Sequence, residues 1–252
     1  MKESGHYYAA DGTAVFEVPN KSKGGMRPTT LKDCKTLGLY PSVTTIMKVL
    51  AAPELDKWKQ QQVLLASLTL PRNPDESDED YCARVMEDAF QQVTDAADLG
   101  TSIHKALENH FQGLPYAPEM ESYVSPVKEW AAKHNVKFLK HELRLVNQEL
   151  GYAGTTDALI EADGVLHVLD YKSRKTKPEY KVTPWSKEPM QIAAYAKIVG
   201  APRGVNLYIS TTEPGRIGEA WYEEETINAE YEAFKHVVAY WQHANNYKPP
   251  TK

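Results

Sequence analysis

The stretch GTTDALIEADGVLHVLDYKSR, residues 154–174, decides how this chain is organised. Its second half predicts a strand in which Asp170 and Lys172 project from the same face, one pleat apart, because strand side chains alternate between faces. Leu166 and Val168 share that face nearer the start of the strand. The strand therefore changes from apolar to charged along its length, and we expect the charged end to face solvent.

Asp157 lies on the strand predicted just before it. Two adjacent strands can bring the carboxylates of Asp157 and Asp170 close enough to hold one divalent cation, which prefers oxygen ligands. Two carboxylates and a lysine suit phosphodiester hydrolysis, in which a metal lowers the pKa of water and Lys172 orients water or stabilises charge on the phosphate. Taken alone, the Asp-x-Lys pattern is a weak signal, and a surface ion pair is the alternative.

Two helices predicted on either side of these strands carry further polar pairs. His104 and Glu108 share one helix face at i, i+4, and so do Gln191 and Tyr195. Each pair has a structural alternative: His104 borders an apolar stripe and could be a core histidine, and Gln191 with Tyr195 could line a packing edge.

The pattern of elements predicts an α/β fold with a central mixed sheet flanked by helices. In order, the expected elements are helices near 98–112 and 119–134, strands at 138–146, 153–161 and 165–172, a helix near 187–199, strands near 204–210 and 218–223, and a final helix from about 226 to 245.

Residues 1–97 are predicted to form an N-terminal extension, and residues 98–252 the core. Residues 1–18 resemble a hairpin turning at Asp11-Gly12. Helices are expected after the N-cap Ser42, after Pro53 and over 78–96, and we expect these helices to arch over the site. The acidic tract at 73–80 fits the first turn of a helix better than a calcium loop.

The composition restricts the function classes. The 252 residues carry 29 basic and 34 acidic side chains, a net charge of −5, so any contact with nucleic acid must be local. Two cysteines are too few for a Cys-only zinc site or an iron–sulfur cluster, and we expect both to be reduced. No run is long enough to span a bilayer and no signal peptide is evident, which predicts a soluble cytoplasmic protein of a bacterium or a phage-infected cell.

Four short motifs occur together in one order: Gly-x-x-x-His (Gly100, His104), Gly-x-x-Asp (Gly154, Asp157), Asp-Tyr-Lys (Asp170, Tyr171, Lys172) and Gln-x-x-x-Tyr (Gln191, Tyr195). With them the chain resembles the RecB-like branch of the PD-(D/E)xK nuclease superfamily over roughly residues 98–200. Upstream, Pro41-Ser42-Val43-Thr44 and Trp58 extend the resemblance weakly, and this pattern is similar to the mitochondrial genome maintenance exonuclease group and to phage exonucleases. Thr156 departs from the family pattern by standing where a proline is common.

The resemblance implies a restriction-endonuclease-like core and a role for each matched residue. His104, Asp157 and Asp170 would bind Mg²⁺ or Mn²⁺ with the Tyr171 carbonyl, and Lys172 would be the catalytic lysine. The residues expected to position or bind DNA are Gln191, Tyr195, Glu142, Ser173, Arg174 and Lys175.

The expected function is a metal-dependent DNA exonuclease that prefers single strands or free ends, in recombination, repair or DNA degradation. Its expected partners are DNA and a recombination or single-strand-binding protein, with no membrane. A basic run with nearby aromatics supplies a phosphate track: Lys172, Arg174, Lys175, Lys177, Lys181 and Lys187, with Tyr180 and Trp185. The alternatives are a catalytically silent relative that binds DNA ends and a different metal-dependent hydrolase.

Overall fold

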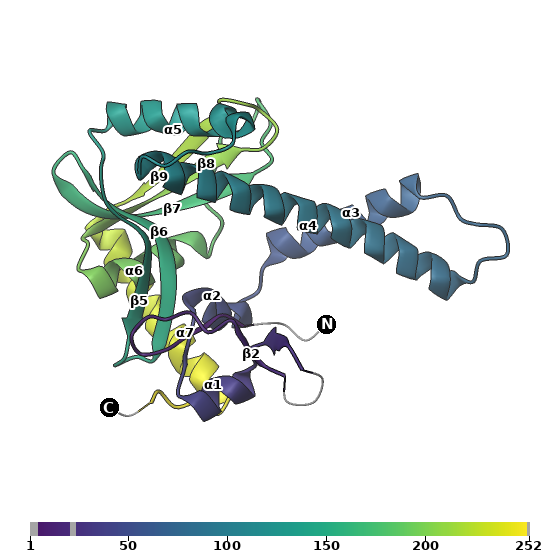
Figure 1. Ribbon diagram of the computed structural model, residues 1–252, viewed down its shortest axis with the longest axis horizontal. Coiled ribbons are helices and arrows are strands. Elements are labelled where there is room, and N and C mark those ends of the chain that lie inside the picture. The colour runs from purple at the N-terminus through teal and green to yellow at the C-terminus, as the bar shows by residue number, and fades with distance from the viewer. Residues whose placement is uncertain (1–4, 21–23, 251–252) are drawn as a thin grey trace.

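A computed structural model describes residues 5–20 and 24–250 and shows an α/β fold built on a five-stranded mixed sheet (Figure 1). The strand order is β5-β6-β7-β8-β9, with β7 and β8 parallel and every other neighbouring pair antiparallel. The strands are β5 (Lys137–Asn147), β6 (Tyr152–Ala162), β7 (Val165–Arg174), β8 (Arg203–Ser210) and β9 (Ile217–Tyr222). No helix among the described residues is long and apolar enough to cross a membrane.

Helices cover both faces of this sheet. The C-terminal half of α4 (Asp78–Phe111) and α5 (Glu121–Lys133) pack on one face, where Ile103 and Val127 meet Leu207 of β8 in one apolar cluster. The helices α6 (Glu188–Val199) and α7 (Glu224–Ala244) cover the other face. A short 3-10 helix, η2 (Pro118–Met120), leads into α5. The element order predicted for the second half of the chain is confirmed.

The N-terminal segment joins the same core instead of forming a separate body. It contains β1 (Tyr7–Tyr8), β2 (Glu17–Pro19), β3 (Met26–Pro28), α1 (Leu31–Leu37), β4 (Tyr40–Pro41), α2 (Val43–Ile46) and η1 (Met47–Val49). Buried side chains of this segment, such as Ile46, lie in one cluster with α6 and α7. Ser42 caps α2 through its hydroxyl, as predicted.

The predicted hairpin over residues 1–18 is only partly correct. The chain does turn at Gly12, whose φ is +87°, and Tyr8 bridges Ala14. However, β1 pairs with β4 and β2 pairs with β3, so the main partners of both strands come from beyond residue 18. Residues 1–4 of the prediction lie outside the described residues.

The predicted break between helices at residues 96–98 is wrong, because α4 continues unbroken for 34 residues. Gly100, expected to open a helix, lies inside it. A Cβ there would lie 2.6 Å from the Ser173 hydroxyl oxygen, so the glycine allows α4 to approach β7 closely. The boundary predicted at residue 97 therefore falls inside a helix.

The helix α3 (Pro53–Thr69) and the N-terminal half of α4 form a helical hairpin that projects from the body in Figure 1. We call residues 53–98 the arm. Its own buried core consists of Ala66, Val85 and Ala89. The expectation that these helices arch over the site is not met, because the arm extends away from the sheet.

The two cysteines differ in environment. Cys34 is fully buried and Cys82 is exposed on the arm, and both are free thiols, as predicted. Burial raises the pKa of the Cys34 thiol to about 12, so at pH 8 it carries almost no thiolate, the form that reacts. We expect a chromogenic disulfide reagent to modify Cys82 alone in the folded protein and both cysteines in denaturant. The absorbance of the released thiol gives the number of cysteines modified. Equal rates for both thiols in the folded protein would contradict this placement.

Candidate active site

The strands β6 and β7 stop exchanging ladder hydrogen bonds where the predicted site begins. Their register runs to the pair Ala158–Leu169 and ends there. Beyond it, side chains of β6 replace the lost backbone partners: the Thr156 hydroxyl donates to the Leu169 carbonyl (3.0 Å), and the Tyr171 amide donates to Asp157 Oδ2 (2.6 Å). The Asp157 carboxylate is thereby held between the two separating strands.

The opposite neighbour of β6 is irregular at the same level. Glu142 of β5 has a φ of +45°, a left-handed conformation that non-glycine residues seldom adopt. The register of β5 with β6 passes from His141–Ala158 to Leu143–Thr156 without a pair at Glu142. Burial first, and then the charges of Asp157 and Glu108, raise the pKa of Glu142. The structure thus brings Glu142 into the electrostatic neighbourhood of Asp157.

The helix α4 delivers His104 to this point. His104 Nδ1 lies 3.1 Å from Asp157 Oδ1, and its ring meets the edge of the Tyr171 ring. Burial lowers the pKa of His104, but the charges of Asp157 and Asp170 raise it more, so the pKa lies above its ordinary value. His104 is not a residue of the apolar core, because its side chain is 30% exposed and lies against Asp157.

The helix α6 supplies the partners of Asp170 and Lys172. Lys172 Nζ lies 2.6 Å from Asp170 Oδ2 and donates to Gln191 Oε1 at 2.9 Å. Gln191 Nε2 in turn lies 3.4 Å from both Asp170 Oδ1 and the Tyr195 hydroxyl. Asp170, Lys172, Gln191 and Tyr195 thus form one hydrogen-bonded chain, and Gln191 is its centre.

The expectation that Asp170 and Lys172 face solvent is wrong. Asp170 is 5% exposed and the Lys172 side chain 24% exposed, because α6 packs over this end of β7. Burial raises the pKa of Asp170, and Lys172 opposes that rise without reversing it. Burial by itself lowers the pKa of Lys172, but the pairing with Asp170 raises it by more. Lys172 is therefore a protonated ammonium group that is held by Asp170. The surface-ion-pair alternative does not describe this pair.

Close packing explains the glycine that precedes Asp157. A Cβ on Gly154 would lie 2.5 Å from Cε1 of the Tyr195 ring. Any side chain at this position would displace the tyrosine ring or the strand. Gly154 is therefore needed for Tyr195 to lie against β6, where its hydroxyl meets Gln191.

Asn206 of β8 is a site residue that the motifs did not reveal. It is completely buried, and its amide nitrogen lies 3.3 Å from Asp170 Oδ2 and 3.3 Å from the Asp170 carbonyl. The Tyr222 hydroxyl donates to Asn206 Oδ1 at 2.9 Å, which directs the amide nitrogen toward Asp170. The signal available in the sequence was a single amide within an otherwise largely apolar strand.

Arg174, expected to bind or position DNA, has its guanidinium paired within the protein. Its guanidinium pairs with the buried Glu188 at 2.5 Å and lies over the rings of Tyr208 and Trp185. Glu188 also accepts hydrogen bonds from the Tyr208 hydroxyl and the Trp185 amide. This network ties the end of β7 to the first turn of α6.

The predicted phosphate track is correspondingly shorter. Lys187 donates hydrogen bonds to the Met47 and Leu50 carbonyls, so its ammonium group caps the C-terminal end of η1. Ser173 lies against Gly100 of α4. The exposed basic residues that remain are Lys175, Lys177 and Lys181.

The donor atoms around Asp157 fit a divalent cation in kind. Burial, with the charge of Asp157, raises the pKa of both Asp170 and Glu142, and His104 adds an imidazole beside Asp157. The carboxylate oxygens are donors that Mg²⁺ and Mn²⁺ prefer, whereas imidazole is a more usual ligand of zinc, iron or copper. Among the residues that the structure describes, however, no three His, Cys, Asp or Glu side chains are gathered closely enough to hold a metal ion. Asp170 is instead paired with Lys172.

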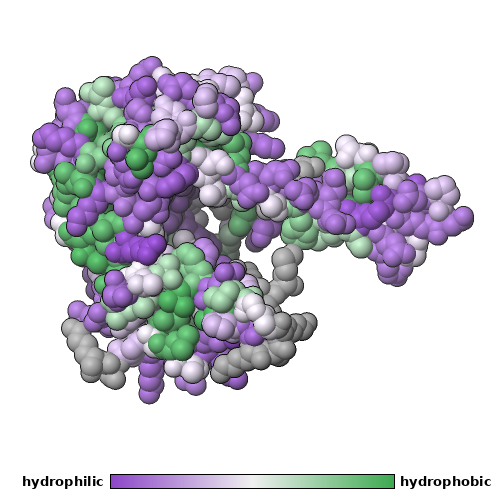
Figure 2. Space-filling model, in the orientation of Figure 1, coloured by the Kyte–Doolittle hydropathy of each residue, from purple (hydrophilic) through white to green (hydrophobic). Residues whose placement is uncertain are grey.

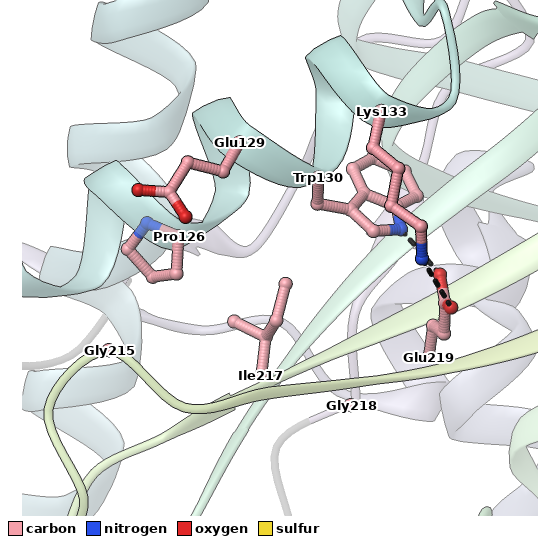
Figure 3. A pocket seen from close by; sticks show the side chains of 8 residues that line it. All are labelled: Pro126, Glu129, Trp130, Lys133, Gly215, Ile217, Gly218 and Glu219. Carbon is pink, nitrogen blue, oxygen red and sulfur yellow. Dashed lines mark hydrogen bonds and ion pairs between the residues drawn. The ribbon is translucent and has the colours of Figure 1, made fainter.

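A separate cavity of about 350 Å³ lies between α5 and β9 (Figure 3). Its charged lining residues are Glu129, Lys133 and Glu219. Glu219 accepts hydrogen bonds from the indoles of Trp130 (2.7 Å) and Trp221 (3.0 Å). These contacts join α5 to the edge strand of the sheet. None of the residues predicted for the site lines this cavity.

No protein-family model matches this sequence, and no curated protein matches it. Among solved structures, the crystal structure of SSO0001 is similar over 73% of this chain and 86% of that chain, with 18% sequence identity and a TM-score of 0.33. A likeness at this TM-score carries no argument about the fold or the site.

Proposed function

We propose that the protein is a divalent-metal-dependent deoxyribonuclease with a restriction-endonuclease-like core, of the RecB-like branch of the PD-(D/E)xK superfamily. The observation that carries the proposal is the meeting of Asp157, Asp170, Lys172 and His104 where β6 and β7 separate. Four motifs that are separate in the sequence supply side chains to this place and to the hydrogen bonds around it.

Each residue of the candidate site has its own proposed role in phosphodiester hydrolysis. His104, Asp157 and Asp170 would hold Mg²⁺ or Mn²⁺, which supplies charge neutralisation at the phosphate and lowers the pKa of water. The Lys172 ammonium orients the attacking water or stabilises charge on the phosphate, and Gln191 holds it in place. The water oxygen bonds to phosphorus and gives up a proton to solvent, the bond to the leaving oxygen breaks, and that oxygen takes a proton from solvent. The Tyr171 carbonyl is the remaining proposed metal ligand.

The surface beside the site suits single-stranded DNA. The loop between β7 and α6 carries the exposed lysines Lys175, Lys177 and Lys181. Tyr180 is 68% exposed on the same loop, where its ring is accessible for stacking on an unpaired base. The loop is held in place by a hydrogen bond from Arg216 to the Tyr180 carbonyl. A short basic surface next to the site is consistent with an exonuclease acting on free or single-stranded ends.

One observation favours a second candidate, a catalytically silent protein that binds DNA ends. Asp170 is already neutralised by Lys172, and no three ligand-type side chains are gathered within the described part of the chain. A silent relative would bind DNA equally well with and without divalent metal and would cut it under neither condition.

The deciding experiment incubates the protein with single-stranded and duplex oligonucleotides labelled at the 5′ or the 3′ end, in Mg²⁺, Mn²⁺ or EDTA. We expect shortening that requires metal and is absent from a Lys172→Met variant. The label pattern gives polarity and strand preference. Binding without any shortening, in protein shown to be folded by circular dichroism, would refute the nuclease and support the silent DNA binder.

Asn206 offers a test of how Asp170 is held. Replacing Asn206 by leucine removes the amide that orients the Asp170 carboxylate, and loss of such an outer partner costs about 10–100-fold in activity. We expect kcat to fall by this factor while KM for DNA is unchanged. Tyr222→Phe, which keeps the amide and loses only its orienting hydroxyl, should have a smaller effect. An Asn206→Leu variant with wild-type kcat would show that Asp170 needs no such support.

A further inference from the structure

The arm carries an apolar groove that its own two helices leave uncovered. The groove has a volume of about 400 Å³, and its apolar wall comprises Val63, Leu64, Met86, Ala89 and Phe90. Leu64 is 62% exposed, and Leu68, one helical turn further along α3, is 82% exposed. In Figure 2 the arm shows hydrophobic residues next to strongly hydrophilic ones. Because Leu64 and Leu68 are so exposed, they contribute little to the packing between the two helices of the arm.

The charge of the arm determines what can cover the groove. Residues 53–98 contain eleven acidic and four basic residues, whereas the whole chain has a net charge of only −5. The arm therefore has a net charge of −7, and the rest of the chain has a net charge of +2. Close to the groove, Asp56 and Glu79 are exposed and lie two helical turns before Val63 and Met86, on the same helix faces. Lys59 is the one basic residue in the wall of the groove.

This combination excludes three occupants on electrostatic grounds. DNA and an anionic membrane would be repelled by the acidic arm, and a second copy would bring an equally acidic arm. An amphipathic helix with leucine-like side chains on one face and lysine or arginine on the other would fill the apolar groove with the first face and pair with the acidic residues of the arm through the second. Helix-in-groove recognition requires such an apolar face, and complementary charge speeds association.

We propose that the arm is a docking surface for a basic amphipathic helix of a partner protein. The surface consists of Leu64, Leu68, Met86 and Phe90 with their acidic surroundings. It lies outside the candidate active site and is independent of the proposed nuclease activity. Because the arm projects from the body (Figure 1), a partner bound there leaves the body of the protein free.

The test uses two labelled synthetic peptides, 18 residues long, with leucine on one helical face and either lysine or glutamate on the other. Fluorescence anisotropy measures their binding to the full chain and to a Leu64→Gln/Leu68→Gln/Phe90→Gln variant. Because these three side chains are exposed, the variant should fold, which thermal unfolding verifies. Leu37→Gln, at a residue 55% exposed on α1, is the matched control.

We expect the basic peptide to bind at least about tenfold more tightly than the acidic one, and the triple variant to lose about tenfold or more of that affinity, equivalent to about 1.4 kcal/mol. The Leu37 control should bind as the wild type does. Equal binding of both peptides, or unchanged binding by the triple variant, would overturn the proposal. So would self-association that sedimentation detects in the wild type but not in the triple variant, or a loss of DNA affinity in that variant.

Discussion

The Lys172→Met variant is expected to lose DNA cleavage by a factor of about 10²–10⁴, the range that a positioned proton-transfer or charge-stabilising group contributes. Methionine keeps most of the aliphatic length of lysine but removes the ammonium group that contacts Asp170 and Gln191. The measurement is the single-turnover rate of cleavage of an end-labelled oligonucleotide in Mg²⁺ and in Mn²⁺.

Lys175→Met is the matched control. Lys175 lies three residues further along the chain and is exposed, so its loss removes the same charge outside the hydrogen-bonded chain. We expect a weaker affinity for DNA that depends less steeply on salt, because one phosphate contact is lost, and an unchanged single-turnover rate at saturation. If Lys172→Met cleaves at a near wild-type rate while Lys175→Met does not, the catalytic lysine has been misassigned.

The Glu188→Gln variant is expected to have the largest effect on stability. The change keeps an acceptor for the Tyr208 hydroxyl but removes the charge that compensates Arg174, whose side chain is only 14% exposed. Leaving one member of a buried pair without its partner costs about 3 kcal/mol or more. For a chain of this length we expect the midpoint of thermal unfolding to fall by about 10 °C.

A double variant separates the ion pair from the packing around it. Arg174→Met/Glu188→Gln removes both charges together and keeps an acceptor for the Tyr208 hydroxyl, so no uncompensated charge is left between Tyr208 and Trp185. We expect it to be more stable than Glu188→Gln alone, because no buried charge is left without its partner. If the double variant loses as much stability as the two single changes added together, the pair is not coupled and Arg174 is free for another role.

Local sequence patterns were sufficient to predict the strands of the second half of the chain and the pairing of Asp170 with Lys172 on one face. Both follow from the alternation of side chains along a strand, which depends on neighbours two residues apart. The cap at Ser42 and the helix start at the acidic tract are local for the same reason. The roles assigned through the family resemblance remain predictions.

Tertiary structure alone decided what surrounds these residues. Asp170 is buried because α6, which begins eighteen residues later, packs over the end of β7, and its support by Asn206 comes from the neighbouring parallel strand. The same packing places the Arg174 guanidinium against the Glu188 carboxylate, with which it forms an ion pair. Gly100 lies within the continuous helix α4, at the place where that helix approaches β7 closely. The sequence by itself determined which residues share a strand face. The burial and the hydrogen-bond partners of those residues depend on contacts between segments distant in the sequence, and the local alternation of side chains does not contain that information.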